Sequence, residues 1–128
     1  MDKLVIQADK APKALGPYSV ANRAGDFVFT AGQLGLDPET GELVTGGVEA
    51  ETRQALTNLR SVLEAAGTGM DKALKTTVFL RDMDDFTRMN AIYAEFFMAN
   101  YPARSTVQVA ALPRNATVEI ELIAIVSA

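Results

Sequence analysis

The 128-residue chain contains no cysteine and no histidine. Their absence excludes a cysteine nucleophile, a Ser-His-Asp triad, a disulfide framework and a zinc site with cysteine or histidine ligands. A chain of this length fits one domain, residues 1–128, which buries roughly two-thirds of its unfolded surface. Such a domain needs neither a disulfide nor a metal to hold it together.

Long apolar runs and an excess of positive charge are also missing. No stretch approaches the ~20 apolar residues that a membrane span needs, and residues 1–7 lack the pattern of a signal peptide. The net charge of −4 at pH 7 gives no long-range attraction to nucleic acid. With 48% hydrophobic residues the composition is globular, and we expect a cytoplasmic protein without membrane or nucleic-acid partners.

The hydrophobic pattern predicts a series of strands interrupted by two helices. Strands are predicted at 4–7, 19–22, 27–30, 73–81, 102–110 and 116–124. Apolar residues at helical spacing predict a helix over 48–66, ended by Gly67, and a second from Asp84 or Asp85 to about Asn100. The second helix carries an aromatic stripe that we interpret as core, formed by Phe86, Met89, Tyr93, Phe96 and Phe97.

Two helices can cover only one face of a sheet of about six strands. The predicted fold class is therefore α+β, with both helices on one face of the sheet and a second face left open. On the last strand Glu119 and Glu121 share a face with Ile123 and Ile125, and we expect that face to be the open one. Leaving each isoleucine in water would cost about 1.5–3 kcal/mol relative to burial. We therefore predict that another subunit covers this face.

Arg104 and Glu119 are the most unusual charged residues in this pattern. If the last two predicted strands pair as a hairpin, both side chains point to the same side, with Thr106 beside Arg104 and Val107 facing the helices. An ion pair at a subunit interface explains the two charges without any function. Alternatively, the guanidinium binds a carboxylate ligand through two parallel hydrogen bonds while the glutamate orients or deprotonates water. The residues alone favour the ion pair.

Two glycine-containing segments offer further candidates. Tyr18 follows the rigid Gly16-Pro17 pair, so it either packs at the junction of loop and strand or stands at the edge of a pocket. Spacing alone favours the packed position. Gly32 follows the strand at 27–30, where a glycine marks a bulge or a close approach of the backbone.

A series of short motifs runs in order through nearly the whole chain. They are Ala11-Pro12 with Gly16-Pro17-Tyr18-Ser19, Ala31-Gly32-Gln33, Pro38 with Thr40-Gly41, Leu63-Glu64-Ala65-Ala66-Gly67, Lys75-Thr76-Thr77-Val78-Phe79-Leu80 with Asp85-Phe86, Asn90 with Tyr93 and Phe96-Phe97, Pro102-Ala103-Arg104-Ser105, Leu112-Pro113 and Val118-Glu119-Ile120-Glu121. The series resembles the reactive-intermediate deaminase family, the RidA or YjgF-like enamine/imine deaminases. So many matches in order are far more specific than any single motif.

The resemblance implies a fold, an assembly and a reaction. The fold would be a chorismate-mutase-like α+β domain with a mixed sheet, assembled as a homotrimer whose sheets form a central barrel, with the sites in clefts between subunits. The reaction would be the hydrolysis of 2-enamine and 2-imine acids, such as 2-aminoacrylate, to 2-keto acids and ammonia. A 2-iminobutanoate/2-iminopropanoate deaminase of this kind is a hydrolase that uses no cofactor and no metal.

The resemblance also implies roles for particular residues. Arg104 is similar to the family arginine that grips the substrate carboxylate, and Glu119 to the glutamate that positions the attacking water. Tyr18 is similar to the tyrosine that closes the pocket, Gly32 would offer backbone contacts, and Asn90 would line the site.

Thr106 marks a departure from the family pattern, because many members carry a cysteine there. It is still expected to bind substrate, so a thiol is not expected to be essential for the reaction.

Other functions stay open at this point. The same pocket would serve a module that binds or senses 2-keto acids without useful catalysis. An endoribonuclease or translation inhibitor is a further alternative, against which the net charge of −4 argues. For a chaperone-like role the sequence offers no discriminating feature.

Overall fold

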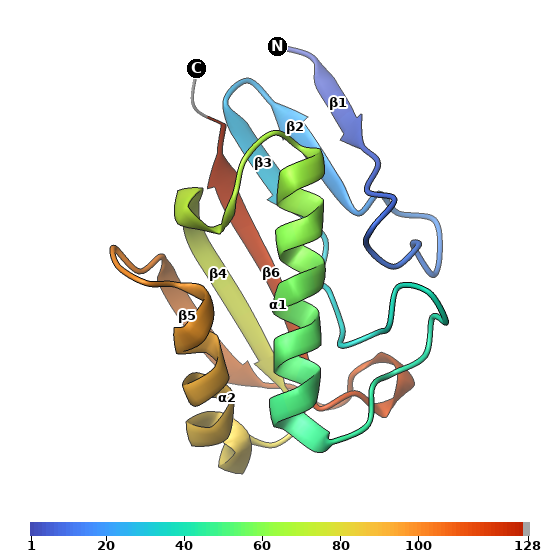
Figure 1. Ribbon diagram of the computed structural model, residues 1–128, viewed down its shortest axis with the longest axis vertical. Coiled ribbons are helices and arrows are strands. Elements are labelled where there is room, and N and C mark those ends of the chain that lie inside the picture. The colour runs from blue at the N-terminus through green and yellow to red at the C-terminus, as the bar shows by residue number, and fades with distance from the viewer. Residues whose placement is uncertain (127–128) are drawn as a thin grey trace.

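The computed structural model describes residues 1–126 and shows a six-stranded sheet backed by helices (Figure 1). The strands are β1 (Lys3–Ile6), β2 (Ala21–Ala24), β3 (Phe27–Thr30), β4 (Ala73–Leu80), β5 (Ala103–Gln108) and β6 (Val118–Ile125). Their order across the sheet is β1-β2-β3-β6-β4-β5, and all neighbouring strands are antiparallel except β4 and β5, which are parallel. The predicted mixed sheet of about six strands is confirmed.

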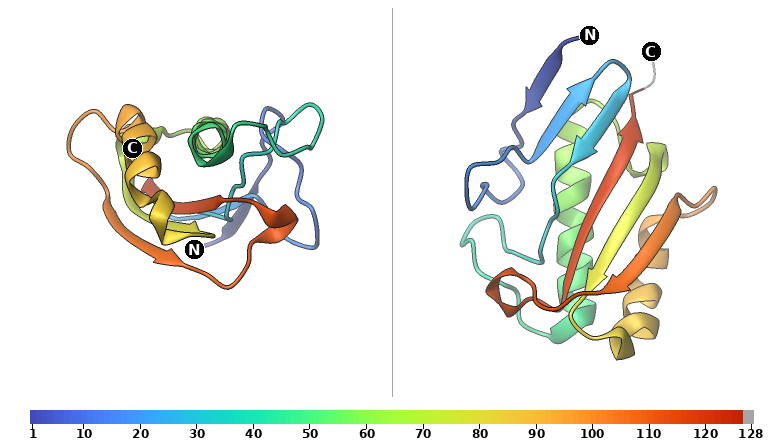
Figure 2. Two further views of the ribbon diagram at one scale, coloured as in Figure 1. Left: turned by 90° about the horizontal axis from the view of Figure 1, so that it is seen from below. Right: turned by 180° about the vertical axis from the view of Figure 1, so that it is seen from behind.

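Both helices, α1 (Gly47–Ala65) and α2 (Phe86–Tyr93), lie on the same face of the sheet (Figure 2). Short 3₁₀ helices occur at Met70–Lys72, Met83–Asp85, Ala94–Phe96 and Pro113–Asn115. Within residues 1–126 the opposite face of the sheet carries no helix, as the view from behind shows. The α+β arrangement predicted from the helix count is therefore confirmed. None of the helices described is long and apolar enough to cross a membrane.

Helix α1 packs along the middle of the sheet through the predicted apolar stripe. Leu56, Leu59 and Leu63 recur at helical spacing and are fully buried. The helix ends before Gly67, whose φ of +85° is a left-handed conformation that glycine adopts without a Cβ penalty. The N–H group of Thr68 then donates to the Leu63 carbonyl at 2.9 Å, which satisfies one of the free carbonyls at the helix end.

The second helix is shorter than predicted. Asp85 stands at its N-cap but, in the part of the chain described, makes no side-chain capping bond. Helical geometry ends at Tyr93 and continues only as a 3₁₀ turn, after which Phe97 has an extended backbone. This change of direction buries Phe97, whose ring lies 4.7 Å from that of Tyr93 between centroids. The prediction of a helix to about residue 100 was wrong, because the backbone leaves helical geometry at Phe97, well before Pro102 would end the helix.

The last two strands do not form the predicted hairpin, because β4 lies between them. Strands β4 and β5 are parallel, and parallel neighbours require a crossover, which α2 supplies. Residues 109–117 then lead past the end of β4 to β6 through a turn in which Arg114 and Asn115 have φ of 57° and 55°. The connection is long enough to pass one strand, so closeness in sequence did not mean pairing.

As a result, Arg104 and Glu119 point to opposite faces of the sheet. Arg104 is in register with Thr76, and Thr76 with the buried Leu122, which places all three on the helix side. Glu119 of β6 and Val107 of β5 lie opposite the same residue of β4, so both point to the open face of the sheet. The prediction that Arg104 shares a face with Glu119, and that Val107 faces the helices, was therefore wrong. Val107 is 42% exposed.

The open face carries large apolar side chains. Phe27 and Phe29 are 46% and 48% exposed and lie in register with Ile125 and Ile123 of β6. Strand β6 alternates buried with less buried residues along its length, which confirms the predicted shared face of its two glutamates and two isoleucines. Cover of this face by another subunit stays a prediction.

Truncating Leu59 tests the packing of α1. The substitution Leu59→Ala is expected to lower the free energy of unfolding by about 2–5 kcal/mol, because it leaves a cavity at a fully buried position. Leu4→Ala, at a residue that is 54% exposed, is the control and should cost less than about 1 kcal/mol. Chemical denaturation at equal protein concentration measures both, and equal losses would contradict this assignment of the core.

Candidate functional site

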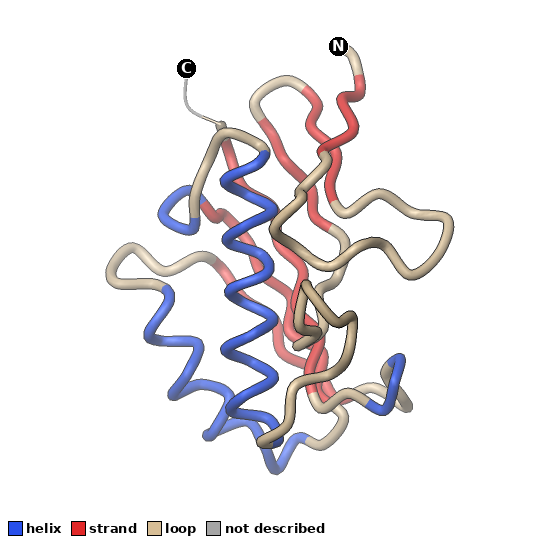
Figure 3. The backbone as a smooth tube through the Cα atoms, turned by 45° about the vertical axis from the view of Figure 1, so that its right-hand side comes forward, coloured by secondary structure: helices blue, strands red, loops and turns tan. Residues whose placement is uncertain are grey.

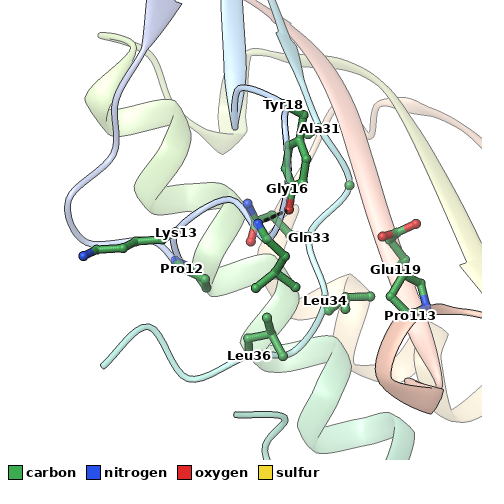
Figure 4. A pocket seen from close by; sticks show the side chains of 12 residues that line it. Pro12, Lys13, Gly16, Tyr18, Ala31, Gln33, Leu34, Leu36, Pro113 and Glu119 are labelled. Carbon is green, nitrogen blue, oxygen red and sulfur yellow. Dashed lines mark hydrogen bonds between the residues drawn. The ribbon is translucent and has the colours of Figure 1, made fainter. Parts of the chain in front are cut away.

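A pocket of about 320 Å³ opens beside the carboxylate of Glu119 (Figure 4). Its walls come from the loop before β2, the segment after β3 and the turn before β6. The lining residues include Pro12, Leu15, Gly16, Tyr18, Gly32, Leu34, Leu36, Pro113 and Glu119. The structure thus brings together three of the predicted site residues, Tyr18, Gly32 and Glu119, in mainly apolar surroundings.

The Glu119 side chain approaches Gly32 closely. A Cβ atom added at Gly32 would lie 2.7 Å from Cδ of Glu119, a distance that real Cβ atoms essentially never show, so the carboxylate would have to move. The carboxylate therefore rests directly against the backbone of the segment after β3. The expectation of a close backbone approach at this glycine is confirmed.

The environment of Glu119 changes its affinity for a proton. Burial beside the apolar wall raises the pKa of the Glu119 carboxyl above its ordinary value, and the neighbouring charge of Glu121 raises the pKa further. A carboxylate of this kind is a stronger base than an exposed glutamate, so it is better suited to accept a proton from water.

Tyr18 stands at the rim of the same pocket. Its hydroxyl oxygen accepts a hydrogen bond from the backbone N–H of Leu15 at 3.1 Å, which folds the loop around the ring (Figure 4). The residue is 47% exposed, so it is not packed at a loop-strand junction, the position that its spacing favoured. Among residues 1–126 no acceptor takes the hydrogen of this hydroxyl, so it can donate to a ligand.

The Arg104 guanidinium lies over two aromatic rings on the other side of the sheet. The guanidinium carbon is 4.7 Å from the centroid of Tyr93 and 5.5 Å from that of Phe86, both on α2. The Tyr93 hydroxyl is fixed in turn by a 2.7 Å hydrogen bond with the Thr76 hydroxyl. Among residues 1–126 no carboxylate lies within 4 Å of Arg104, so within one chain the ion pair with Glu119 does not form.

Asn90 and Thr106 accompany Arg104. Asn90 and Arg104 line a second pocket of about 440 Å³ together with Tyr93 and Tyr101. The side-chain oxygens of Asn90 and Thr106 are buried and have no hydrogen-bond partner among the described residues. Buried oxygens without partners are costly, so this region is suited to a ligand that donates hydrogen bonds.

The six predicted site residues therefore form two separate groups in one chain. Tyr18, Gly32 and Glu119 lie in the first pocket, whereas Asn90 on α2 and Arg104 and Thr106 on β5 lie on the helix side of the sheet. The two groups are on opposite sides of the sheet and are separated by β4.

The sequence did not lead us to the aromatic rings that lie under Arg104, because the aromatic stripe along α2 was interpreted wholly as core. Phe86 and Tyr93 are about two helical turns apart and so lie on one side of α2, and this spacing could have indicated a platform for a cation. The apolar wall formed by Leu34 and Leu36 left no comparable signal. In the part of the chain that the structure describes, no three His, Cys, Asp or Glu side chains are grouped so as to hold a metal.

Comparison with known proteins shows close relatives. The family model described as Endoribonuclease L-PSP matches residues 8–126. A 2-iminobutanoate/2-iminopropanoate deaminase from Mus musculus is 51% identical over 121 residues, which cover 94% of this chain and 90% of that protein. A RutC family protein from Pyrococcus horikoshii is 50% identical over 122 residues, covering 95% and 97%.

A solved structure shows the same fold. The crystal structure of E. coli TdcF with bound serine has a TM-score of 0.92 and 40% sequence identity, covering 97% of this chain and 99% of that one. The family model and these relatives together show that the chain belongs to the Endoribonuclease L-PSP family, the YjgF/RidA family of proteins.

Proposed function

We propose that this protein hydrolyses reactive 2-enamine and 2-imine acids, such as 2-aminoacrylate, to 2-keto acids and ammonia. The observation that carries the proposal is the guanidinium of Arg104, held over two rings with no carboxylate partner among the described residues. Its planar fork suits a substrate carboxylate, which accepts two parallel hydrogen bonds. Two relatives about half identical to this chain are named 2-iminobutanoate/2-iminopropanoate deaminase and a third is named Reactive Intermediate Deaminase A, which supports the same reaction here.

The reaction needs one proton acceptor and a positioned water. An enamine first becomes the imine by moving a proton from nitrogen to its terminal carbon. Water then adds to the carbon of the protonated imine while the Glu119 carboxylate takes one proton from that water. The Glu119 carboxyl returns this proton to the amino group, and ammonia leaves as the hydroxyl group loses its proton and the carbonyl forms. The raised pKa of Glu119 suits this exchange of a proton in both directions. The imine carbon is already electrophilic, so the chemistry calls for no cofactor or metal, and holding the substrate by its carboxylate supplies the proximity.

We further propose that two copies of the chain complete each site, in a homotrimer. One chain keeps Arg104 and Glu119 apart, so a small substrate that touches both must contact two copies. The exposed rings of Phe27 and Phe29, beside Ile123 and Ile125, form an apolar surface of the kind that contacts another subunit. Strand β5, which carries Arg104, is at the edge of the sheet and is therefore available to a neighbour.

Ribonuclease activity is the competing function that the family description names. The chain carries a net charge of −4 and lacks histidine, so it has neither an attraction for RNA nor the imidazole that often transfers protons. An assay with labelled RNA, on protein freed of contaminating nucleases, is the control for this alternative. Cleavage that disappears on substitution of Arg104 or Glu119 would favour it.

A coupled assay tests the proposal. A serine dehydratase generates 2-aminoacrylate, and the loss of the enamine and the release of pyruvate are followed with and without this protein. The protein is expected to accelerate both in proportion to its concentration. Binding of keto acids without acceleration would instead support a sensing module.

Substituting Arg104 tests the carboxylate contact. Arg104→Ala is expected to lower kcat/KM about 100-fold or more, since two charge-assisted hydrogen bonds are lost. Arg104→Lys keeps the charge but not the fork and should fall between the wild type and Arg104→Ala. Both variants should keep the wild-type oligomeric state in light scattering. Wild-type turnover by Arg104→Ala would refute the role.

The pH dependence of the rate tests Glu119. The protonated carboxyl cannot accept a proton, so the rate should fall as the pH drops through the raised pKa of Glu119, above the ordinary 4.5. Glu119→Gln should lower kcat by ~10²–10⁴-fold. Its rate should also no longer fall at low pH, so the acid limb of the pH–rate profile should disappear. Glu121→Gln is the matched control. The Glu121→Gln variant should stay active, and its rate should fall only at lower pH, because the substitution removes the charge that helps to raise the pKa of Glu119. An unchanged limb in Glu119→Gln would exclude it as the base.

A further inference from the structure

Two of the buried polar residues of α1 hydrogen-bond to other elements and are not used by the proposed chemistry. Glu51 is 4% exposed and Asn58 is 1% exposed. They are about two helical turns apart and so lie on the same side of the helix. A buried polar group costs free energy unless it is hydrogen-bonded, so the partners of these two side chains indicate their role.

Asn58 hydrogen-bonds to the segment at 33–36, which forms one wall of the Glu119 pocket. Its amide nitrogen donates to the carbonyl oxygens of Leu34 at 3.2 Å and Leu36 at 2.9 Å. Its amide oxygen accepts a hydrogen bond from Nε2 of Gln54 at 2.9 Å. Both N–H groups are therefore used on two carbonyls of the segment whose side chains line the pocket. The contact spans 24 and 22 residues of sequence, so it joins separate elements.

Glu51 binds the chain on the other side of that pocket. One oxygen of its carboxylate accepts a hydrogen bond from the backbone N–H of Thr117 at 2.8 Å, two residues before Glu119. The backbone of α1 also touches the wall itself, because a Cβ atom added at Gly35 would lie 2.6 Å from Cα of Glu51. One helix face thus holds both segments that enclose the carboxylate.

The two segments are also joined to each other. Gln33 and Ile120 exchange backbone hydrogen bonds of 2.8 and 3.1 Å. This bridge lies between Gly32, which supports the carboxylate, and Leu34, which Asn58 holds. If the segment held by Asn58 moved, the bridge would therefore move with it, and the contact between Gly32 and Glu119 would change.

We propose that Glu51 and Asn58 are positioning residues for Glu119. They hold the segment at 33–36 and the start of β6 against α1, and so keep the Glu119 carboxylate pressed against Gly32 and poor in water. The kinetic consequence rests on the proposed deaminase function, whereas the positioning itself does not.

Asn58→Leu is the main test, because it removes both donated hydrogen bonds without changing a charge. Thr52→Val is the matched control: Thr52 lies on the same helix, is fully buried, and its hydroxyl has no partner in the described chain. Both variants leave in place Glu121, whose charge acts on Glu119, and the titratable side chains that line the pocket, Tyr18 and Lys13, of which Lys13 points away from Glu119 (Figure 4). A change in the pH at which Glu119 titrates would then reflect a change in the position of the pocket-lining segment at 33–36.

Two readouts do not depend on turnover. In Asn58→Leu, but not in Thr52→Val, the Glu119 carboxyl is expected to titrate at lower pH in carbon-13 NMR, since water reaches it. The amides of Gln33 and Ile120 should exchange hydrogen faster while the amides of α1 stay protected. If the folded Asn58→Leu protein titrates and exchanges like Thr52→Val, the proposal is overturned, because a purely stabilising role would move neither signal.

Turnover adds the catalytic consequence. Asn58→Leu is expected to lower kcat about 10-fold with KM nearly unchanged, because Arg104 still holds the substrate while the base is misplaced. Glu51→Leu should do the same, and Glu51→Gln, which keeps an oxygen acceptor for Thr117, should restore the rate. If wild-type protein shows no turnover, the proposed function fails, and the positioning role is decided by the two NMR readouts.

Discussion

A parallel strand cannot follow its neighbour through a tight turn, and this constraint decides where the two charged groups of the site lie. Because β4 and β5 are parallel, the chain crosses over through α2 and places β5 at the edge of the sheet, outside β4. Arg104 on β5 then comes under α2, and Glu119 on β6 comes to the opposite face. Both helices lie on one face of the sheet, so in the described chain the other face carries no helix (Figure 3).

Keeping these charges apart has a chemical consequence. A guanidinium paired with Glu119 in the same chain would lower the pKa of the carboxyl and occupy the N–H donors that the proposed substrate carboxylate would use. Instead, Arg104 is supported by aromatic faces, which hold the cation without using its N–H donors. Glu119 is supported by an apolar wall and the backbone of Gly32, which raise its pKa. In the proposed reaction each environment prepares its group for a ligand, and the hydrogen bonds of Glu51 and Asn58 would hold the Glu119 side in place.

Local patterns predicted the elements well but not their neighbours. The apolar stripe of α1, its end at Gly67 and the alternation on β6 follow from periods of 3.6 and 2, so they could be predicted from the sequence. The position of β5 could not, because strand order depends on contacts between distant residues, and assuming a hairpin reversed the face of Arg104. The family resemblance supplied the candidate site residues, whose roles stay predictions, and their division into two groups appears only in the folded chain. The role proposed for Asn58 also required the fold, because its partners lie far from it in sequence.

The central claim is that Arg104 of one copy works with Glu119 of another. Arg104→Ala and Glu119→Gln chains, each nearly inactive alone, would be mixed in equal amounts, unfolded and refolded together, and assayed with enzymatically generated 2-aminoacrylate. With random assembly of a closed ring, roughly one quarter of the sites receive both intact residues, so the mixture should recover about a quarter of wild-type activity. Refolding each variant alone is the control. A mixture no more active than the separate variants would contradict the account, because it would mean that both residues must come from the same chain.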